Sequence, residues 1–140
     1  MEQNISFSKF GKSFQEDLCH LILNDRPFAD QVFEVLDLSF LELKHLRVFV
    51  EKIKEYRQKY GVHPTSNIMH SIIRTGLEDK QESVKVRIRE YYARVLAKGH
   101  VPKSSEYIKD TALDFCKKQK LKEALIKSVD LIKSSSCLSS

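Results

Sequence analysis

The stretch SEYIKDTALDFCKKQKLKEALIKSVDLI, residues 105–132, decides the fold we expect for this chain. Its apolar residues recur every three or four positions, which predicts one long helix. In the first half, Ile108, Ala112 and Phe115 form a single stripe. The apolar residues of the second half are Leu121, Ala124, Leu125, Ile126, Val129, Leu131 and Ile132. An arc of that width predicts a helix buried on two sides, by its own domain and by a further partner.

Working outward from this helix, the same spacing predicts two short amphipathic helices near the N-terminus. The first begins at Ser13, which forms a capping box with Glu16, and its apolar face ends at Ile22. Asn24 and Asp25 interrupt the chain, and Pro27 stands in the first turn of the second helix, where a missing N–H is tolerated.

A longer helix follows and is expected to be the central one. Ser39 and Glu42 form a second capping box at its start, and Gly61 supplies a left-handed stop after Tyr60. A further short helix with apolar residues on one side is closed by Gly76.

Residues 79–98 fit two kinds of secondary structure. Val84, Val86 and Ile88 alternate with basic residues, as in a strand. Val84, Ile88, Tyr91 and Tyr92 also share one helical face, and no partner strand is evident nearby. We expect a helix, with a strand as the alternative.

Length and composition describe one ordered, helical domain. The chain has 140 residues, of which 41% are hydrophobic, with only 4 Gly and 3 Pro. No apolar run is long enough to span a membrane, and the first residues lack the pattern of a secretion signal. The three cysteines form no CxxC pair, which suits a reducing compartment, so we expect a cytoplasmic protein.

The net charge of +5 is concentrated in the second half of the chain. Residues 1–62 carry nine Lys or Arg against ten Asp or Glu, whereas residues 63–140 carry fifteen against nine. A basic half is compatible with nucleic-acid binding, but it also describes an ordinary solvated helical surface.

Motifs for catalysis or cofactor binding are incomplete. Gly11-Lys12-Ser13 resembles the end of a phosphate-binding loop, but the glycine that should stand five residues earlier is Ser6. The five histidines show no HExxH pattern and no i, i+4 pair with another His or Cys, as a zinc site would need. We therefore predict no catalytic, cofactor-binding or metal-ligating residues in this chain.

Two basic segments are candidate nucleic-acid contacts. Their members are Lys85, Arg87, Arg89, Lys117, Lys118 and Lys120. Arg94 and Lys98 continue the first segment, so Tyr91 and Tyr92 lie among its basic residues and could stack on single-stranded bases. Because both tyrosines fall on the apolar helical face, we favour core packing for them.

The segment Phe115–Leu125, together with Tyr107, resembles the last helix in the N-terminal domain of DnaB-type replicative helicases, especially the phage-encoded branch. The order of the elements agrees over residues 10–133. The other matching segments are Phe14–Leu23, Asn24-Asp25, Asp37-Leu38-Ser39-Phe40, Leu41–Tyr60 and Gly61-Val62-His63-Pro64-Thr65.

This resemblance implies an all-α fold, a compact multi-helix head followed by a C-terminal helical hairpin. In that family the hairpins of two subunits pack together, three dimers form a collar, and the collar contacts primase and sometimes a helicase loader. The ATPase motor is a separate domain, so the chain is expected to be the collar domain alone, from a bacterial cell or a phage-infected host. The expected division is an N-terminal tail over residues 1–12, a head over 13–76, a hairpin region over 77–133, and the start of a linker or an artificial end over 134–140.

The preferred hypothesis is thus a non-catalytic oligomerisation and partner-docking domain. Its expected self-association surface consists of Tyr107, Ile108, Phe115, Leu121, Leu125 and Ile132. The alternative is a stand-alone basic helical protein that binds nucleic acid, with single-stranded DNA as a secondary partner. A small helical enzyme has the least support.

Overall fold

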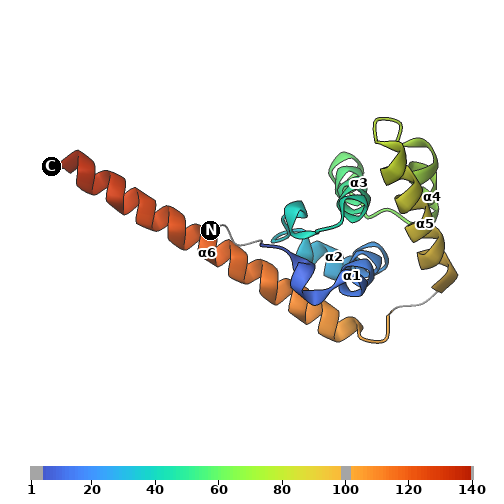
Figure 1. Cartoon of the computed structure of the whole chain (residues 1–140), viewed down its shortest axis with the longest axis horizontal. Coiled ribbons are helices and arrows are strands. Elements are labelled where there is room, and N and C mark those ends of the chain that lie inside the picture. The colour runs from blue at the N-terminus through green and yellow to red at the C-terminus, as the bar shows by residue number, and fades with distance from the viewer. Residues whose placement is uncertain (1–4, 99–101, 140) are drawn as a thin grey trace.

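A computed structural model describes residues 5–98 and 102–139, and every regular element in these ranges is a helix (Figure 1). The all-α prediction is confirmed. The elements are η1 (Phe7–Phe10), α1 (Lys12–Asn24), α2 (Arg26–Val32), η2 (Leu38–Phe40), α3 (Lys44–Tyr60), α4 (Ser66–Thr75), α5 (Glu82–Lys98) and α6 (Ser105–Ser139), where η denotes a 3₁₀-helix.

The core forms around α1, which packs against α2, α3 and α6, while α5 packs against α3. Leu18, Leu21 and Ile22 of α1 are fully buried, as the apolar spacing of this helix predicts. The buried side chains of all the helices belong to one hydrophobic cluster, which extends from Phe7 to Cys116. The head is therefore held by burial of apolar surface over most of the chain.

Residues 82–98 form helix α5, so the strand alternative is wrong. Val84, Ile88 and Tyr91 are buried, whereas Val86 is exposed. The packing partner α3 selects the 3.6-residue period over the alternating one, because only the helical face covers the core continuously.

Two of the predicted helix starts differ from the structure. Helix α1 begins at Lys12 with Gly11 as its N-cap, so Ser13 lies inside the helix and does not cap it. Residues 38–40 form η2, and α3 begins only at Lys44. The backbone amide of Glu42 donates a hydrogen bond to the buried Gln15 side chain of α1 (2.9 Å). This bond holds the loop between η2 and α3 against α1.

The predicted division into tail, head and hairpin region is not reflected in separate cores. Phe7 lies in the expected tail, yet it is fully buried in the common cluster, so the tail prediction is wrong at this residue. The main packing partner of α5 is α3, and those of α6 are α1 and α2. The backbone of α6 continues as a helix to Ser139, past the residue where a linker was expected. The predicted turn at 99–101, with His100, lies outside the described residues, as does the side chain of Cys137.

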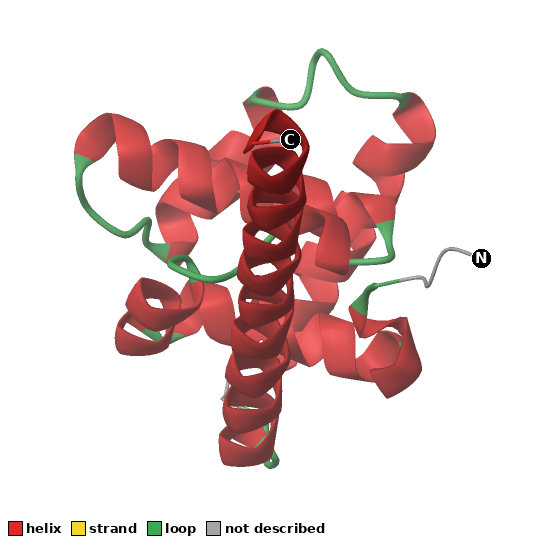
Figure 2. Cartoon of the chain, turned by 90° about the vertical axis from the view of Figure 1, so that its left-hand side faces the viewer, coloured by secondary structure: helices red, strands yellow, loops and turns green. Residues whose placement is uncertain are grey.

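Helix α6 consists of two halves with different surroundings. The first half lies along α1 and α2, and the second half projects away from the head as an isolated helix (Figure 1). Figure 2 shows the same helix from its C-terminal side, standing in front of the head. This projecting half is the main candidate for an interaction site.

Candidate interaction surfaces

The projecting half of α6 exposes large apolar side chains. Leu121, Leu125 and Ile132 are 60%, 58% and 66% exposed. Ile126, Val129 and Leu131 are exposed as well. We call Leu121, Ala124, Leu125, Val129, Leu131 and Ile132 the apolar stripe. A contiguous exposed apolar surface of this kind is typical of a protein interaction site.

The apolar stripe lies on the opposite side of α6 from the residues that contact the head. Leu121 follows the buried Ala112 by nine residues, and Leu125 follows the buried Cys116 by the same interval. Nine residues make about two and a half helical turns, so each pair points in opposite directions. The apolar stripe is therefore a second face of α6, available to a partner other than its own head.

The structure divides the predicted self-association residues into two groups. Leu121, Leu125 and Ile132 belong to the apolar stripe, but Ile108 and Phe115 are only 4% and 7% exposed. Phe115 is part of an aromatic cluster in which its ring centroid lies 4.9 Å from that of Phe7. The prediction that Ile108 and Phe115 form an association surface is wrong, because the head already covers their side of the helix.

Tyr107 is exposed, but it lies apart from the apolar stripe. It precedes Leu125 by eighteen residues, which is about five turns, so the two side chains share a face. Between them, Asp114 and Lys118 form an ion pair of 3.0 Å. Tyr107 therefore sits on the same side of the helix, separated from the stripe by a charged segment.

Sequence reasoning did not include Val129 and Leu131 in the predicted surface, although the structure exposes both. The signal was present in the width of the apolar arc. Only the position of the head shows which part of that arc is free.

The first half of α6 is fixed to the head by polar contacts as well as by burial. Lys109 Nζ lies 2.6 Å from a carboxylate oxygen of Asp25, and the other oxygen accepts the N-capping hydrogen bond of Phe28 in α2. Partial burial opposes ionisation of Asp25, but the bonds from Lys109 and Phe28 outweigh it and lower the pKa. These contacts set the direction in which α6 leaves the head.

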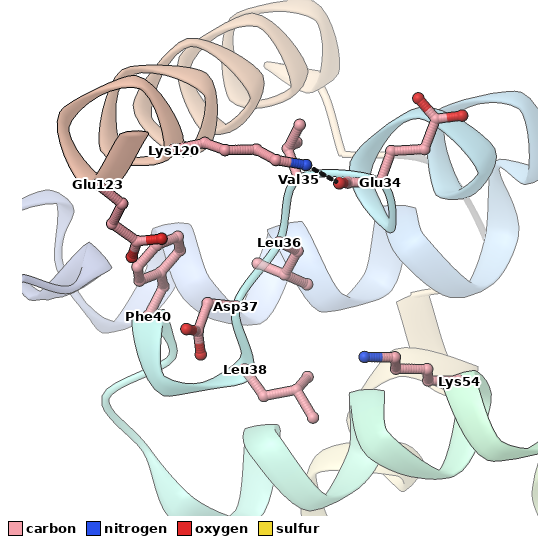
Figure 3. Close-up of a pocket in the computed structure, with 9 residues that line it drawn as sticks. All are labelled: Glu34, Val35, Leu36, Asp37, Leu38, Phe40, Lys54, Lys120 and Glu123. Atoms are coloured by element: carbon pink, nitrogen blue, oxygen red, sulfur yellow. Dashed lines mark hydrogen bonds between the residues drawn. The ribbon is translucent and has the colours of Figure 1, made fainter. Parts of the chain in front are cut away.

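A groove of about 410 Å³ opens where α6 leaves the head (Figure 3). The segment between α2 and η2 lines it with the apolar side chains Val35 and Leu36, and η2 adds Leu38. The remaining lining residues are Glu34, Asp37, Phe40, Lys54, Lys120 and Glu123. Lys120 extends from α6 and donates a hydrogen bond of 3.1 Å to the Glu34 carbonyl at one edge. The groove therefore combines an apolar floor with a charged rim.

The two predicted basic segments lie on different helices with different neighbours. Arg87 and Arg89 are exposed on α5, and Lys117 is exposed on α6. Lys85 lies 3.7 Å from Glu82 in an ion pair. Lys118 pairs with Asp114, and Lys120 is bonded to the Glu34 carbonyl.

The aromatic residues near the first basic segment are part of the core. Tyr91 and Tyr92 are buried, and their hydroxyls donate to the carbonyls of Glu16 (2.6 Å) and Ser66 (2.7 Å). Burial raises the pKa of both tyrosines. The preference for core packing is confirmed, and these rings offer no stacking surface for bases.

The described residues contain no group of three His, Cys, Asp or Glu side chains that could hold a metal ion. Cys19 and Cys116 are buried free thiols. Burial raises the pKa of Cys19, and it raises the pKa of Cys116 to about 12, so both stay protonated at neutral pH. Over the same part of the chain, no helix has the length and apolar character needed to cross a membrane.

Comparison with known proteins leaves these surfaces to be interpreted from sequence and geometry. No family model, no curated protein and no solved structure matches the chain.

Proposed function

We propose that this chain is a non-catalytic oligomerisation and partner-docking domain of a DnaB-type replicative DNA helicase. The observation that supports the proposal most directly is the apolar stripe on the projecting half of α6. The motor that hydrolyses ATP would reside in a separate domain, and this domain needs no cofactor of its own.

The stripe favours association for energetic reasons. Full burial of one large aliphatic side chain contributes roughly 1.5–3 kcal/mol relative to its exposure. Leu121, Leu125, Leu131 and Ile132 are each mostly exposed in the single chain. A helix–helix contact along this face would bury them together, and this gain can exceed the entropy lost on association.

Docking of another protein requires a second surface, and the groove beside α6 meets that requirement. Its floor is partly apolar, and its rim carries carboxylates at Asp37 and Glu123. A primase or a helicase loader could place a segment there while the apolar stripe is occupied by a second copy. The chain would then join its own assembly to a partner.

The test of the proposal is the molar mass of the purified chain, measured by light scattering after gel filtration at increasing concentration. We expect mass above that of one chain, and we expect Leu125→Asp to return it to the monomer. The matched control is Ser134→Asp, which adds the same charge on the polar side of the same helix. A wild-type protein that stays monomeric at high concentration would reject the proposal.

The exposed arginines Arg87 and Arg89 favour a second candidate function, binding of single-stranded nucleic acid. This function predicts an affinity for single-stranded DNA that falls steeply with salt, since each neutralised phosphate releases a counterion. Arg87→Ala combined with Arg89→Ala should then weaken binding and reduce the salt dependence. Absent or salt-independent binding would remove this candidate.

A further inference from the structure

We infer that the apolar stripe pairs with the α6 of a second copy in the antiparallel sense, about a two-fold axis between Leu125 and Ser128. The inference rests on the proposed function and adds the identity and direction of the partner helix. It is carried by the spacing, the side-chain volumes and the charges along one line of α6.

The spacing of this line is the same in both directions. Leu121, Leu125, Ser128 and Ile132 are separated by four, three and four residues, which is the pattern of a helix–helix seam. Reversing the order leaves the pattern unchanged, so a two-fold axis at its centre places Leu121 against Ile132 of the second copy. An isologous interface requires this kind of self-complementary surface.

Side-chain volume favours the same arrangement. In the antiparallel pair the bulky Leu125 faces the small Ser128 of the second copy. Each large side chain thus packs against a small one at the same level of the seam. A parallel pair in register would place the two Ser128 residues together and leave a gap. The Ser128 hydroxyl already donates to the Ala124 carbonyl (3.0 Å), so its burial leaves no unsatisfied donor.

Charge disfavours the parallel register. The seam continues toward the head through Lys118 and Asp114, again at intervals of three and four residues. In a parallel pair each of these residues would face its own copy, and like charges in contact are unfavourable. In the antiparallel pair they lie beside the C-terminal part of the other α6 and away from their own copies.

The shape of the molecule leaves room for this arrangement. The outer half of α6 projects clear of the head in Figure 1, and in Figure 2 it stands in front of the head. An antiparallel partner would place the two heads at opposite ends of the helix pair. Ala124, Val129 and Leu131 flank the seam on its two sides, so they would be covered as well.

The experiment uses two variants that each carry one new cysteine on the seam, Leu121→Cys and Ile132→Cys, each combined with Cys137→Ser. The remaining thiols, Cys19 and Cys116, are buried. The first variant carries a tag that changes its mass, and the two proteins are mixed and treated with a short bis-maleimide reagent. Lys127→Cys, on the polar side of the helix, is the control for random encounter.

The antiparallel pair predicts mainly the mixed product, Leu121→Cys joined to Ile132→Cys. In that pair, the same residue in the two copies would be about 16 Å apart along the helix axis, which is too far for the reagent to bridge. If each variant instead joins mainly to itself, the inferred direction is overturned while self-association stands. If no product exceeds the control and the mass is that of a monomer, both the inference and the proposed function fail.

A second measurement does not depend on cross-linking. Lys118→Ala should leave the dissociation constant of the pair within about twofold of the wild type, because Lys118 has no like-charged neighbour there. Clear tightening of the pair by Lys118→Ala would indicate the parallel register and overturn the inference.

Discussion

His63 links the ends of three helices through both of its ring nitrogens. Nε2 lies 2.7 Å from the Leu23 carbonyl at the end of α1, and Nδ1 lies 2.9 Å from the Arg57 guanidinium in α3. Arg57 also pairs with Asp30 of α2 at 2.6 Å. A carbonyl can only accept, so Nε2 carries the proton, and Nδ1 of the neutral ring accepts from Arg57.

This network predicts that the head loses stability in mild acid. Burial lowers the pKa of His63 below 6.5, and this outweighs the Leu23 bond, which raises it. As the pH falls, His63 is protonated in the unfolded chain before it is protonated in the folded chain. The stability that neutral His63 contributes above pH 6.5 is therefore lost as the pH falls through the lower pKa of the folded state. We expect the urea concentration at the midpoint of unfolding to decrease as the pH is lowered from 7.5 to about 5.

His63→Gln should reduce this pH dependence without abolishing it. Burial and the nearby Arg87 also lower the pKa of His45, which will continue to contribute in the variant. Urea unfolding of both proteins over the same pH range provides the comparison. An identical pH profile for the variant would contradict the assignment to His63.

At the scale of single elements, the end of α3 depends on Gly61. This residue has φ +71° in the left-handed region, and its amide donates to the Arg57 carbonyl (2.9 Å) to close the helix. No other heavy atom lies within 4 Å of the position that a Cβ would take, so only the backbone conformation opposes a larger residue. The left-handed stop predicted for this glycine is confirmed.

Gly61→Ala should therefore destabilise the head by about 1 kcal/mol. The measurement is the free energy of unfolding in urea, with Gly61→Asn as the control, because Asn tolerates the left-handed region better than Ala. Equal stability of the Ala variant and the wild type would show that this turn can relax to another conformation.

The helices could be predicted from sequence more reliably than their starts. The apolar period identifies α1, α3 and α6, because packing against a core preserves it. The start of α1 could not be derived from the capping box at Ser13, since the buried Phe7 and η1 draw the chain into the head before that residue. The apolar residues of α5 fit both the alternating pattern of a strand and the period of a helix. Contact with α3 decides in favour of the helix.

At the scale of the whole molecule, the head and the projecting half of α6 are expected to be energetically separable. The last residue of the common core in α6 is Cys116, and Lys120 makes the final described polar contact with the head. A chain ending after Glu123 should keep the cooperative unfolding transition of the full chain and lose self-association. Circular dichroism and light scattering measure the two properties, and a truncated chain that still associates would place the interface on the head.

The sequence by itself determined the helical class, the presence of a long last helix, the absence of recognised catalytic motifs and the excess of apolar residues in residues 121–132. These properties follow from local periodicity and composition, which do not depend on distant contacts. Only the tertiary structure decided that Ile108 and Phe115 belong to the core and that Leu121, Leu125 and Ile132 remain free. The physical reason is that α1 and α2 cover only the first half of α6. Which face of a helix stays exposed depends on the elements that pack against it.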